Sequence, residues 1–384
     1  MRVAFFFGSG ISIDSKAASV KELTNAVCHG KWIIDSQGRI GPARGSAGSD
    51  KHCRGMQAFL LILESMLLPR LKAAKKDCTY EDLFAAVTQL DQDERQDIIS
   101  PLISPFSRRL RLRVSKGHLL PKRASAGNPS PFATLTSNAM SFIQWIVFHT
   151  LIKAKKPVKM AAISGAAKKC DRLDIFSLNH DLLIEAELRR TSARFSDGFE
   201  DYDGDVRVFN GGWDSRKVRL YKLHGSVNWV RAKLPDYTQF VIPRTTGKRL
   251  LKAWDGRAIS LLDNGQPSFL TGTTVKEQAY GTYLIGELFY KFRHVLTEHR
   301  RLIVCGYGWQ DRGINHRLEQ WLGDQRSNKM LILHGGRSVD VIENDFWATR
   351  WNNYAKGRLQ VFPKFLNACS FSDFDDFLKP DPAP

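Results

Sequence analysis

Residues 2–12 read RVAFFFGSGIS, and this stretch carries the strongest fold signal in the chain. A short apolar run with three consecutive aromatic residues, ended by a glycine, predicts a buried strand over residues 2–7. Residues 8–12 then form a tight glycine turn, and apolar residues at helical spacing follow over residues 17–27. Strand, glycine turn and helix in this order are typical of the first unit of an α/β fold.

The same alternation returns in the second half of the chain. Helical patterns follow three of the predicted strands, and polar residues or glycines stand at several strand ends. We therefore predict an α/β fold with a Rossmann-like, doubly wound parallel sheet. The further predicted strands cover residues 173–178, 218–223, 301–305 and 329–333, and the helices cover 182–190, 282–297 and a segment after Asp311.

An inserted helical module interrupts this alternation. Apolar residues keep helical spacing in several segments between residues 52 and 165, whereas residues 37–50 and 107–131 have the composition of loops. The predicted domains are therefore residues 1–51 with 166–365 for the sheet domain, 52–165 for a basic helical module, and 366–384 for a C-terminal tail.

The positive charge of the chain is concentrated in one block. The formal net charge is +18, and residues 98–170 contain no Asp or Glu. Such a block favours a polyanion or an acidic partner surface, and its alternative is a solvated face. Its cations are Arg108, Arg109, Arg111, Arg113, Lys116, Lys122, Arg123, Lys153, Lys155, Lys156, Lys159, Lys168 and Lys169.

Composition excludes several classes of protein. A hydrophobic fraction of 43% and a charged fraction of 25% exclude global disorder. No apolar run reaches the roughly 18 residues of a membrane span, and no signal-peptide pattern is present, so we expect a cytoplasmic protein without a membrane segment. No C-x-x-C pair occurs, so we expect neither structural zinc nor a disulfide framework. The cysteines are Cys28, Cys53, Cys78, Cys170, Cys305 and Cys369.

Polar residues gather where predicted strands end. In open α/β sheets the carboxyl ends of the strands are where ligands bind, so these residues are site candidates. Each also has a structural interpretation: Asn179 and Asp181 as helix caps, His224 as a buried core histidine. Gly8 and Gly10 would let the backbone approach a pyrophosphate, or would simply form a tight turn. The other candidates at strand ends are Ser226, Gly306, Tyr307 and Asp311.

Four short motifs, in this order, resemble those of the sirtuin family. Residues 8–12, Gly-Ser-Gly-Ile-Ser, are similar to the sirtuin Gly-Ala-Gly-Ile-Ser, and residues 179–181, Asn-His-Asp, to Asn-Ile-Asp. Residues 223–225, Leu-His-Gly, resemble the segment that carries the sirtuin catalytic histidine. Residues 306–315 resemble the Gly-Tyr-Ser-Phe-x-Asp-x-x-Ile-Asn segment of sirtuin-like bacterial defence proteins. The resemblance covers about residues 1–340.

The chain also departs from the sirtuin pattern. The four-cysteine zinc ribbon of deacetylase sirtuins is missing, and the helical module takes the place of their small domain. Lys16 and Ala18 stand where relatives often have Gly and Pro before Ser19. Ser9 replaces Ala and Gly308 replaces Ser, and both substitutions keep the residue small.

The resemblance implies NAD+ as substrate and cleavage of the nicotinamide–ribose bond. It implies catalytic roles for Asn179 in orienting water or ribose, for Asp181 as a hydrogen-bond acceptor, and for His224 as general base. It places phosphate or ribose at Ser12 and Ser19, and the adenosine end at Gly306 and Asp311. The remaining residues assigned to the NAD+ site are Gly8, Ser9, Gly10, Ser226 and Tyr307, and no metal ligand is expected.

The resulting hypothesis is a sirtuin-like NAD+ glycohydrolase of bacterial antiphage defence, which forms nicotinamide and ADP-ribose or a cyclic product. The resemblance implies a homo-oligomeric ring and a HerA-type ATPase partner, and the basic module suggests a nucleic-acid contact. Two alternatives stay open. One is an NAD-dependent protein deacylase, and the other is a nucleic-acid-binding or DNA-processing defence subunit on a sirtuin-like scaffold.

Overall fold

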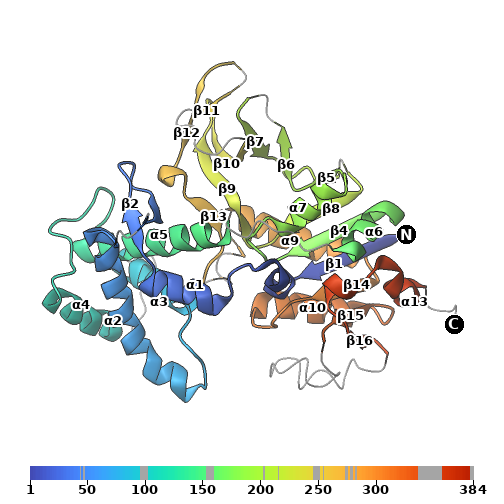
Figure 1. Ribbon diagram of the computed structural model, residues 1–384, viewed down its shortest axis with the longest axis horizontal. Coiled ribbons are helices and arrows are strands. Elements are labelled where there is room, and N and C mark those ends of the chain that lie inside the picture. Colours follow the sequence, from blue (N-terminus) through green and yellow to red (C-terminus); the bar gives the residue numbers. More distant parts are fainter. Residues whose placement is uncertain are drawn as a thin grey trace.

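Seven parallel strands form the central sheet of the computed structural model (Figure 1). Their order is β16-β15-β14-β1-β4-β8-β5, and every neighbouring pair is parallel. The predicted Rossmann-like α/β fold is confirmed. The strands are β1 (Arg2–Phe7), β4 (Arg172–Ser177), β5 (Phe195–Ser196), β8 (Val218–Lys222), β14 (Arg301–Cys305), β15 (Lys329–Leu333) and β16 (Leu359–Phe362).

The structure describes most of the chain. The exceptions are residues 44, 46–47, 96–102, 153–159, 202–203, 215, 245–250, 254, 273–275, 277–279, 282, 336–356 and 381–384.

Strand β1 lies at the point where the chain reverses its direction of travel across the sheet. From β1 the chain moves to β4 and β8 on one side, and it later returns to β14, β15 and β16 on the other. The carboxyl ends of β1 and β14 therefore bound a topological switch point, the usual ligand crevice of such sheets.

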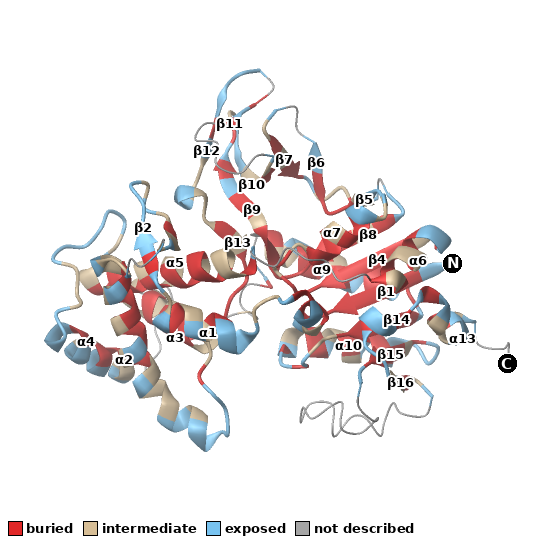
Figure 2. Ribbon diagram, in the orientation of Figure 1, coloured by how far each residue is buried: buried red, intermediate tan, exposed pale blue. Residues whose placement is uncertain are grey.

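Both faces of β1 are buried, which explains its unbroken apolar sequence. Phe5 and Phe7 pack with α6 (Ala161–Lys169) and α7 (Leu183–Arg190), whereas Ala4 and Phe6 face α9 (Tyr283–Thr297) and α10 (Arg312–Asp324). Figure 2 shows the resulting band of buried residues along the central strands.

The helical module forms a group of helices beside the central sheet (Figure 1). The buried residues of these helices form a hydrophobic cluster. Helix α1, which follows the glycine turn, packs in this cluster and not on the sheet. The module also holds the hairpin β2 (Trp32–Ile34) and β3 (Ile40–Pro42). Its helices are α1 (Val20–His29), α2 (Lys51–Ala73), α3 (Tyr80–Arg95), α4 (Ser104–Lys116) and α5 (Pro131–Leu151).

Several predicted segments differ in detail. Strand β3 lies inside the expected loop 37–50, and α4 (Ser104–Lys116) overlaps the first part of the expected arm 107–131. The predicted boundary at residues 165 and 166 falls inside α6, whose buried residues pack with the sheet. Residues 366–378 form the short helices η3 (Leu366–Ala368), η4 (Phe371–Phe374) and α13 (Asp375–Leu378), and bury Leu366, Cys369, Phe371 and Phe374 against the sheet domain.

A second, antiparallel sheet was not predicted. It lies within residues 199–269, in the order β11-β12-β9-β10-β7-β6, with β13 paired to β9. Most of its strands are too short to give a clear alternation. They are β6 (Phe199–Asp201), β7 (Val206–Phe209), β9 (Gly225–Lys233), β10 (Thr238–Pro243), β11 (Leu251–Lys252), β12 (Ala258–Leu261) and β13 (Pro267–Phe269).

Within the described residues, no helix combines the length and apolar character that a membrane span requires.

Candidate functional site

The turns after β1 and β14 cross at the switch point. Gly8 N donates to the Cys305 carbonyl (3.0 Å), and Gly10 N donates to the Gly306 carbonyl (2.8 Å). A Cβ on Gly8 would lie 2.4 Å from the Gly306 oxygen, and Gly306 itself has a positive φ of 66°. Close backbone approach therefore requires glycine at these positions. The amides of Gly8 and Gly10 are already occupied, so their predicted contact with a pyrophosphate stays a prediction.

Three predicted residues from two strand ends form one buried hydrogen-bonded relay. Asn179 Nδ2 donates to Ser12 Oγ (3.0 Å), and Ser12 Oγ donates to Asp181 Oδ2 (2.7 Å). Ser12 lies in the 3₁₀ helix η1 (Ser9–Ser15), which follows β1, whereas Asn179 and Asp181 follow β4. Parallel neighbouring strands end at the same edge, so these distant segments of sequence meet there.

Asp181 also has a structural task. Its Oδ1 accepts from the backbone amide of Leu183 (3.0 Å) at the start of α7, and its carbonyl accepts from Lys222 Nζ. Lys222 is buried and forms an ion pair with buried Glu185 (3.1 Å). The N-cap of α7 is Leu182, so Asp181 stabilises the turn before the helix while it also belongs to the relay.

His224 lies in a second polar group at the same edge. Its Nε2 is 2.9 Å from Tyr280 Oη and 3.1 Å from Asp311 Oδ2, and Tyr280 Oη donates to Asp311 Oδ2 (2.5 Å). Because the tyrosine hydroxyl hydrogen goes to Asp311, Nε2 of His224 carries a hydrogen in this arrangement. The lone pair of a neutral His224 ring is then on Nδ1.

Burial controls the charge of these groups. It lowers the pKa of His224 below its ordinary value, although the hydrogen bond to Asp311 opposes the shift. Burial alone would raise the pKa of Asp311, but the hydrogen bond from His224 and those from Tyr280 and the Ile314 amide hold it well below its usual range. A carboxylate beside a neutral imidazole is the resulting state at neutral pH.

His180 lies between the two polar groups. Its ring centroid is 6.3 Å from that of His224 and 4.7 Å from that of Phe269. Burial, followed by repulsion from His224, Lys276 and Lys222, lowers the pKa of His180 well below its ordinary value. This ring is therefore neutral as well.

Three buried polar atoms, two in the turn after β4 and one after β13, have no hydrogen-bond partner among the described residues. They are Asn179 Oδ1, His180 Nδ1 and Thr271 Oγ1. Such atoms cost about 1–3 kcal/mol each when unsatisfied, so a bound ligand or water is their natural partner. This observation favours a binding site over a purely structural polar cluster.

The other predicted residues lie in different settings. Ser19 is the N-cap of α1, where it accepts from the Glu22 amide and donates to the Glu22 carboxylate. Ser226 Oγ donates to the His180 carbonyl (3.3 Å), and Ser9 is exposed. Tyr307 Oη donates to Asn315 Oδ1 (2.8 Å) and to the Asp311 carbonyl (3.0 Å). The structure thus brings Ser12, Asn179, Asp181, His224 and Asp311 together at one edge.

One predicted residue lies beside the histidine. The Asp311 carboxylate contacts His224 and also caps α10 through the Ile314 amide (3.1 Å), and its expected role at the adenosine end stays a prediction. The turn after β14 bends back over β1, and this bend carries Asp311 to the histidine.

The sequence analysis missed Tyr280, Lys222 and Glu185. Tyr280 stacks on Phe289 with a centroid distance of 4.1 Å, and no motif distinguishes it from a core aromatic residue. Lys222 could have been found from the sequence, because it ends an apolar strand that is expected to be buried. A lysine in such a place needs an acidic partner.

No group of three or more His, Cys, Asp or Glu that could hold a metal ion occurs among the described residues. All six cysteines are buried and unpaired with one another. The absence of zinc stays a prediction, which elemental analysis of the purified protein can test.

Comparison with known proteins gives one family match. A search of curated proteins found no match. A family model described as a SIR2-like domain matches residues 174–354, a segment that begins in β4 and contains Asn179, Asp181, His224, Tyr280 and Asp311. Residues 174–354 are therefore similar to a SIR2-like domain, and SIR2-like domains in general belong to NAD-dependent enzymes.

Proposed function

We propose that this chain is an NAD+ glycohydrolase that cleaves the nicotinamide–ribose bond. The observation that carries the proposal is that two buried polar groups lie at one edge of the sheet. They are the Ser12–Asn179–Asp181 relay and the His224–Tyr280–Asp311 group, and the His180 ring in the relay turn lies 6.3 Å from the His224 ring. Unpartnered polar atoms at the same place support a ligand there.

The reaction needs little nucleophilic power. The C1′–N bond breaks with its electron pair leaving on the nicotinamide nitrogen, and the ribose passes through an oxocarbenium-like state. A water oxygen then bonds to C1′ and loses one proton. The products are nicotinamide, ADP-ribose and that proton.

His224 is suited to accept this proton. Its ring is held through Nε2 by Asp311 and Tyr280, and its lowered pKa keeps it neutral at physiological pH. Nδ1 is the basic atom, and Asp311 stabilises the imidazolium that forms. In catalytic triads, too, the histidine accepts the proton and a carboxylate holds its ring and stabilises the charged form.

Asn179 is suited to orient the water or a ribose hydroxyl. Its Nδ2 is fixed by Ser12, which leaves the unpartnered Oδ1 as an acceptor. Asp181 holds Ser12 in place and, through its cap on α7, holds the turn that carries Asn179.

Incubation of the purified chain with NAD+, followed by chromatography, tests the proposal. We expect equal amounts of nicotinamide and ADP-ribose, and a cyclic ADP-ribose peak would change only the second product. A parallel incubation with acyl-lysine peptides tests the deacylase alternative. NAD+ that stays intact on its own, but is consumed with release of nicotinamide when the peptides are deacylated, would replace the hydrolase proposal by that alternative.

The pH profile of NAD+ cleavage gives a second prediction. Neutral His224 is the active base, and burial lowers its pKa below the ordinary 6.5. We expect kcat/KM to stay level as the pH falls to 6.5 and to decline only below it. The measurement is initial rate against pH, with the folded fraction checked by circular dichroism at each pH. A decline centred above 6.5 would contradict the assignment of His224 as an unprotonated base.

The biological setting is proposed from the sirtuin-like defence resemblance. We propose an NAD-depleting role in antiphage defence, assembly into a homo-oligomeric ring and a HerA-type ATPase as partner. Light scattering of the chain alone, and again after mixing with such an ATPase, tests both kinds of assembly.

The basic helix α4 supports a nucleic-acid contact as an additional function. Arg108, Arg109 and Arg113 are exposed on α4, whereas Arg111 pairs with Glu94 and lies over the Phe132 ring (4.8 Å). Three exposed arginines within two turns suit a run of phosphates.

Charge reversal tests this contact. We expect the triple variant R108E/R109E/R113E to weaken binding of duplex DNA by at least about tenfold, because each phosphate contact contributes about −0.9 to the log–log salt slope. The variant K72E/K75E/K76E, at an exposed end of α2, is the control with the same change of charge. Fluorescence anisotropy at two salt concentrations is the measurement. Equal DNA binding by both variants would leave α4 a solvated face.

A further inference from the structure

A cavity of about 620 Å³ lies where the helical module, the antiparallel sheet and α9 meet. Its walls come from α3, α5, β9, β10, β13 and α9, and none of the predicted site residues lines it. This volume lies within the usual range for small-molecule pockets. The proposed NAD+ hydrolysis does not use it.

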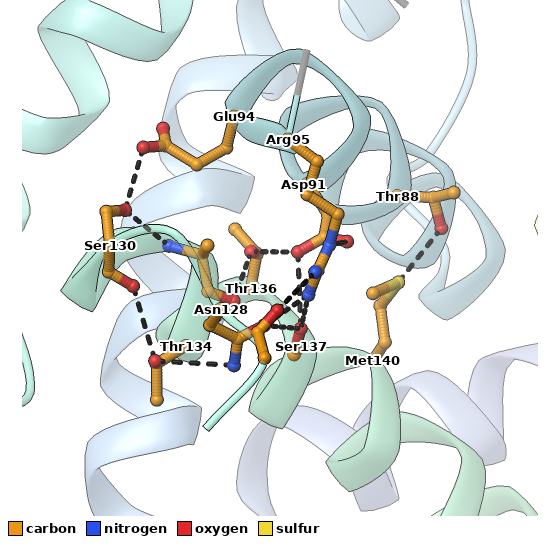
Figure 3. A network of polar contacts seen from close by, with 12 residues as sticks. Thr88, Asp91, Glu94, Arg95, Asn128, Ser130, Thr134, Thr136, Ser137 and Met140 are labelled. Atoms are coloured by element: carbon orange, nitrogen blue, oxygen red, sulfur yellow. Dashed lines mark hydrogen bonds and ion pairs between the residues drawn. The ribbon is translucent and has the colours of Figure 1, made fainter. Parts of the chain in front are cut away.

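Polar contacts hold the cavity walls in place. Ser141 Oγ on α5 donates to Gln266 Oε1 (2.6 Å), and Gln266 Nε2 donates to Gln144 Oε1, so the helical module is tied to the segment before β13. Ser137, also on the wall, belongs to a buried network in which its Oγ accepts from Arg95 (2.8 Å) and donates to Asp91 (Figure 3). A preformed cavity lowers the ordering cost of binding.

The lining combines aromatic rings with amide groups. Phe84, Phe240 and Phe269 come from three different elements, and the side-chain amides of Gln144, Gln266 and Asn264 stand beside them. Aromatic faces stack on any nucleobase, and amides donate to and accept from base edges. We propose that this cavity binds the base of a nucleoside or nucleotide, separately from the site around His224.

The same lining disfavours two other ligand classes. A plain acyl chain would offer no hydrogen-bonding group to the polar side chains of this lining. A small inorganic anion would find one cation on the wall, Arg231, which lies 3.8 Å from Asp263. Arg231 and Asp263 are largely exposed, which suits contact with the ribose or a phosphate outside the deeper base pocket.

The cavity also contacts the segment that positions the histidines. The Phe269 ring lies 4.7 Å from the His180 ring, and the Leu270 amide donates to the His224 carbonyl (2.7 Å). Both residues line the cavity. Phe269 and Leu270 thus connect the cavity to the His180 ring and to the backbone of His224. An effect of the bound ligand on catalysis through this connection rests on the proposed NAD+ hydrolysis.

Direct binding tests the proposal without any need for turnover. Calorimetry would use adenosine, guanosine, cytidine, uridine and their 5′-monophosphates as probes. Ser268→Trp fills the cavity from its wall, and Ser260→Trp on neighbouring β12 is exposed and serves as the matched control. Gln144→Ala removes an amide without adding bulk.

We expect at least one probe to bind. Ser268→Trp and Gln144→Ala should weaken that binding by about tenfold or more, which corresponds to about 1.4 kcal/mol. Ser260→Trp and His224→Ala should leave it unchanged. If none of the eight probes binds, the proposal is overturned. It is also overturned if both cavity variants bind normally, or if His224→Ala abolishes binding. If Ser268→Trp does not fold, Gln144→Ala decides alone. A failure of NAD+ hydrolysis would remove only the effector step and leave the binding result intact.

Discussion

Replacement of His224 by alanine is expected to slow NAD+ hydrolysis by about 10²- to 10⁴-fold, the usual cost of losing a general base. The ring is the group best placed to take the water proton, since burial keeps it neutral and Asp311 with Tyr280 fixes its orientation. Quantification of nicotinamide by chromatography gives the rate. The matched control is His294→Ala, because His294 is exposed on α9, away from the site.

The Tyr280→Phe variant tests whether Tyr280 acts by positioning His224. It removes the hydroxyl between His224 and Asp311 but keeps the ring that stacks on Phe289. We expect a smaller loss of kcat and a changed pH profile, because the hydrogen bonds around His224 rearrange. Near wild-type turnover by a folded His224→Ala protein would refute the catalytic assignment.

Replacement of Lys222 by methionine is expected to lower the free energy of unfolding by about 3–5 kcal/mol. Lys222 is 1% exposed and pairs with buried Glu185 (3.1 Å), so the variant leaves a buried carboxylate without its cation. It also removes the hydrogen bond from Nζ to the Asp181 carbonyl, which helps hold the catalytic turn. Urea unfolding followed by circular dichroism measures the loss.

The loss in the free energy of unfolding of the Lys222→Met variant should grow as the pH rises. Burial already raises the pKa of Glu185, and Lys222 opposes that shift. Without Lys222 the folded state holds the Glu185 proton to a higher pH than the unfolded state does, so the variant loses further stability as the pH rises. The double variant K222M/E185L should recover most of the loss, since it removes both charges. Wild-type stability of Lys222→Met alone would show that the pair contributes little.

Local sequence patterns predicted the central sheet and the end of the sheet where the site lies. The apolar run of residues 2–7 could be buried on both faces only within a covered sheet, and glycines 8, 10 and 306 marked the close crossing of two turns. Parallel strands align their carboxyl ends, so Asn179, Asp181 and His224 were expected at one edge. These features depend on residue type and spacing within short segments.

The partners of those residues depend on which segments become neighbours in space. Tyr280 reaches His224 from 56 residues away and Asp311 from 87, and no periodicity in the chain encodes either distance. Likewise, α1 has the apolar stripe of any surface helix, and only the presence of α2, α3 and α5 decides that it packs in the helical module.

The sequence by itself determined the parallel sheet and the position of the polar turns, because strand periodicity and glycine geometry are local. Only the tertiary structure decided that Asp311 and Tyr280 hold His224 and that Lys222 neutralises Glu185. The reason is that a buried charge or donor pairs with whichever group the folded chain brings within hydrogen-bond distance.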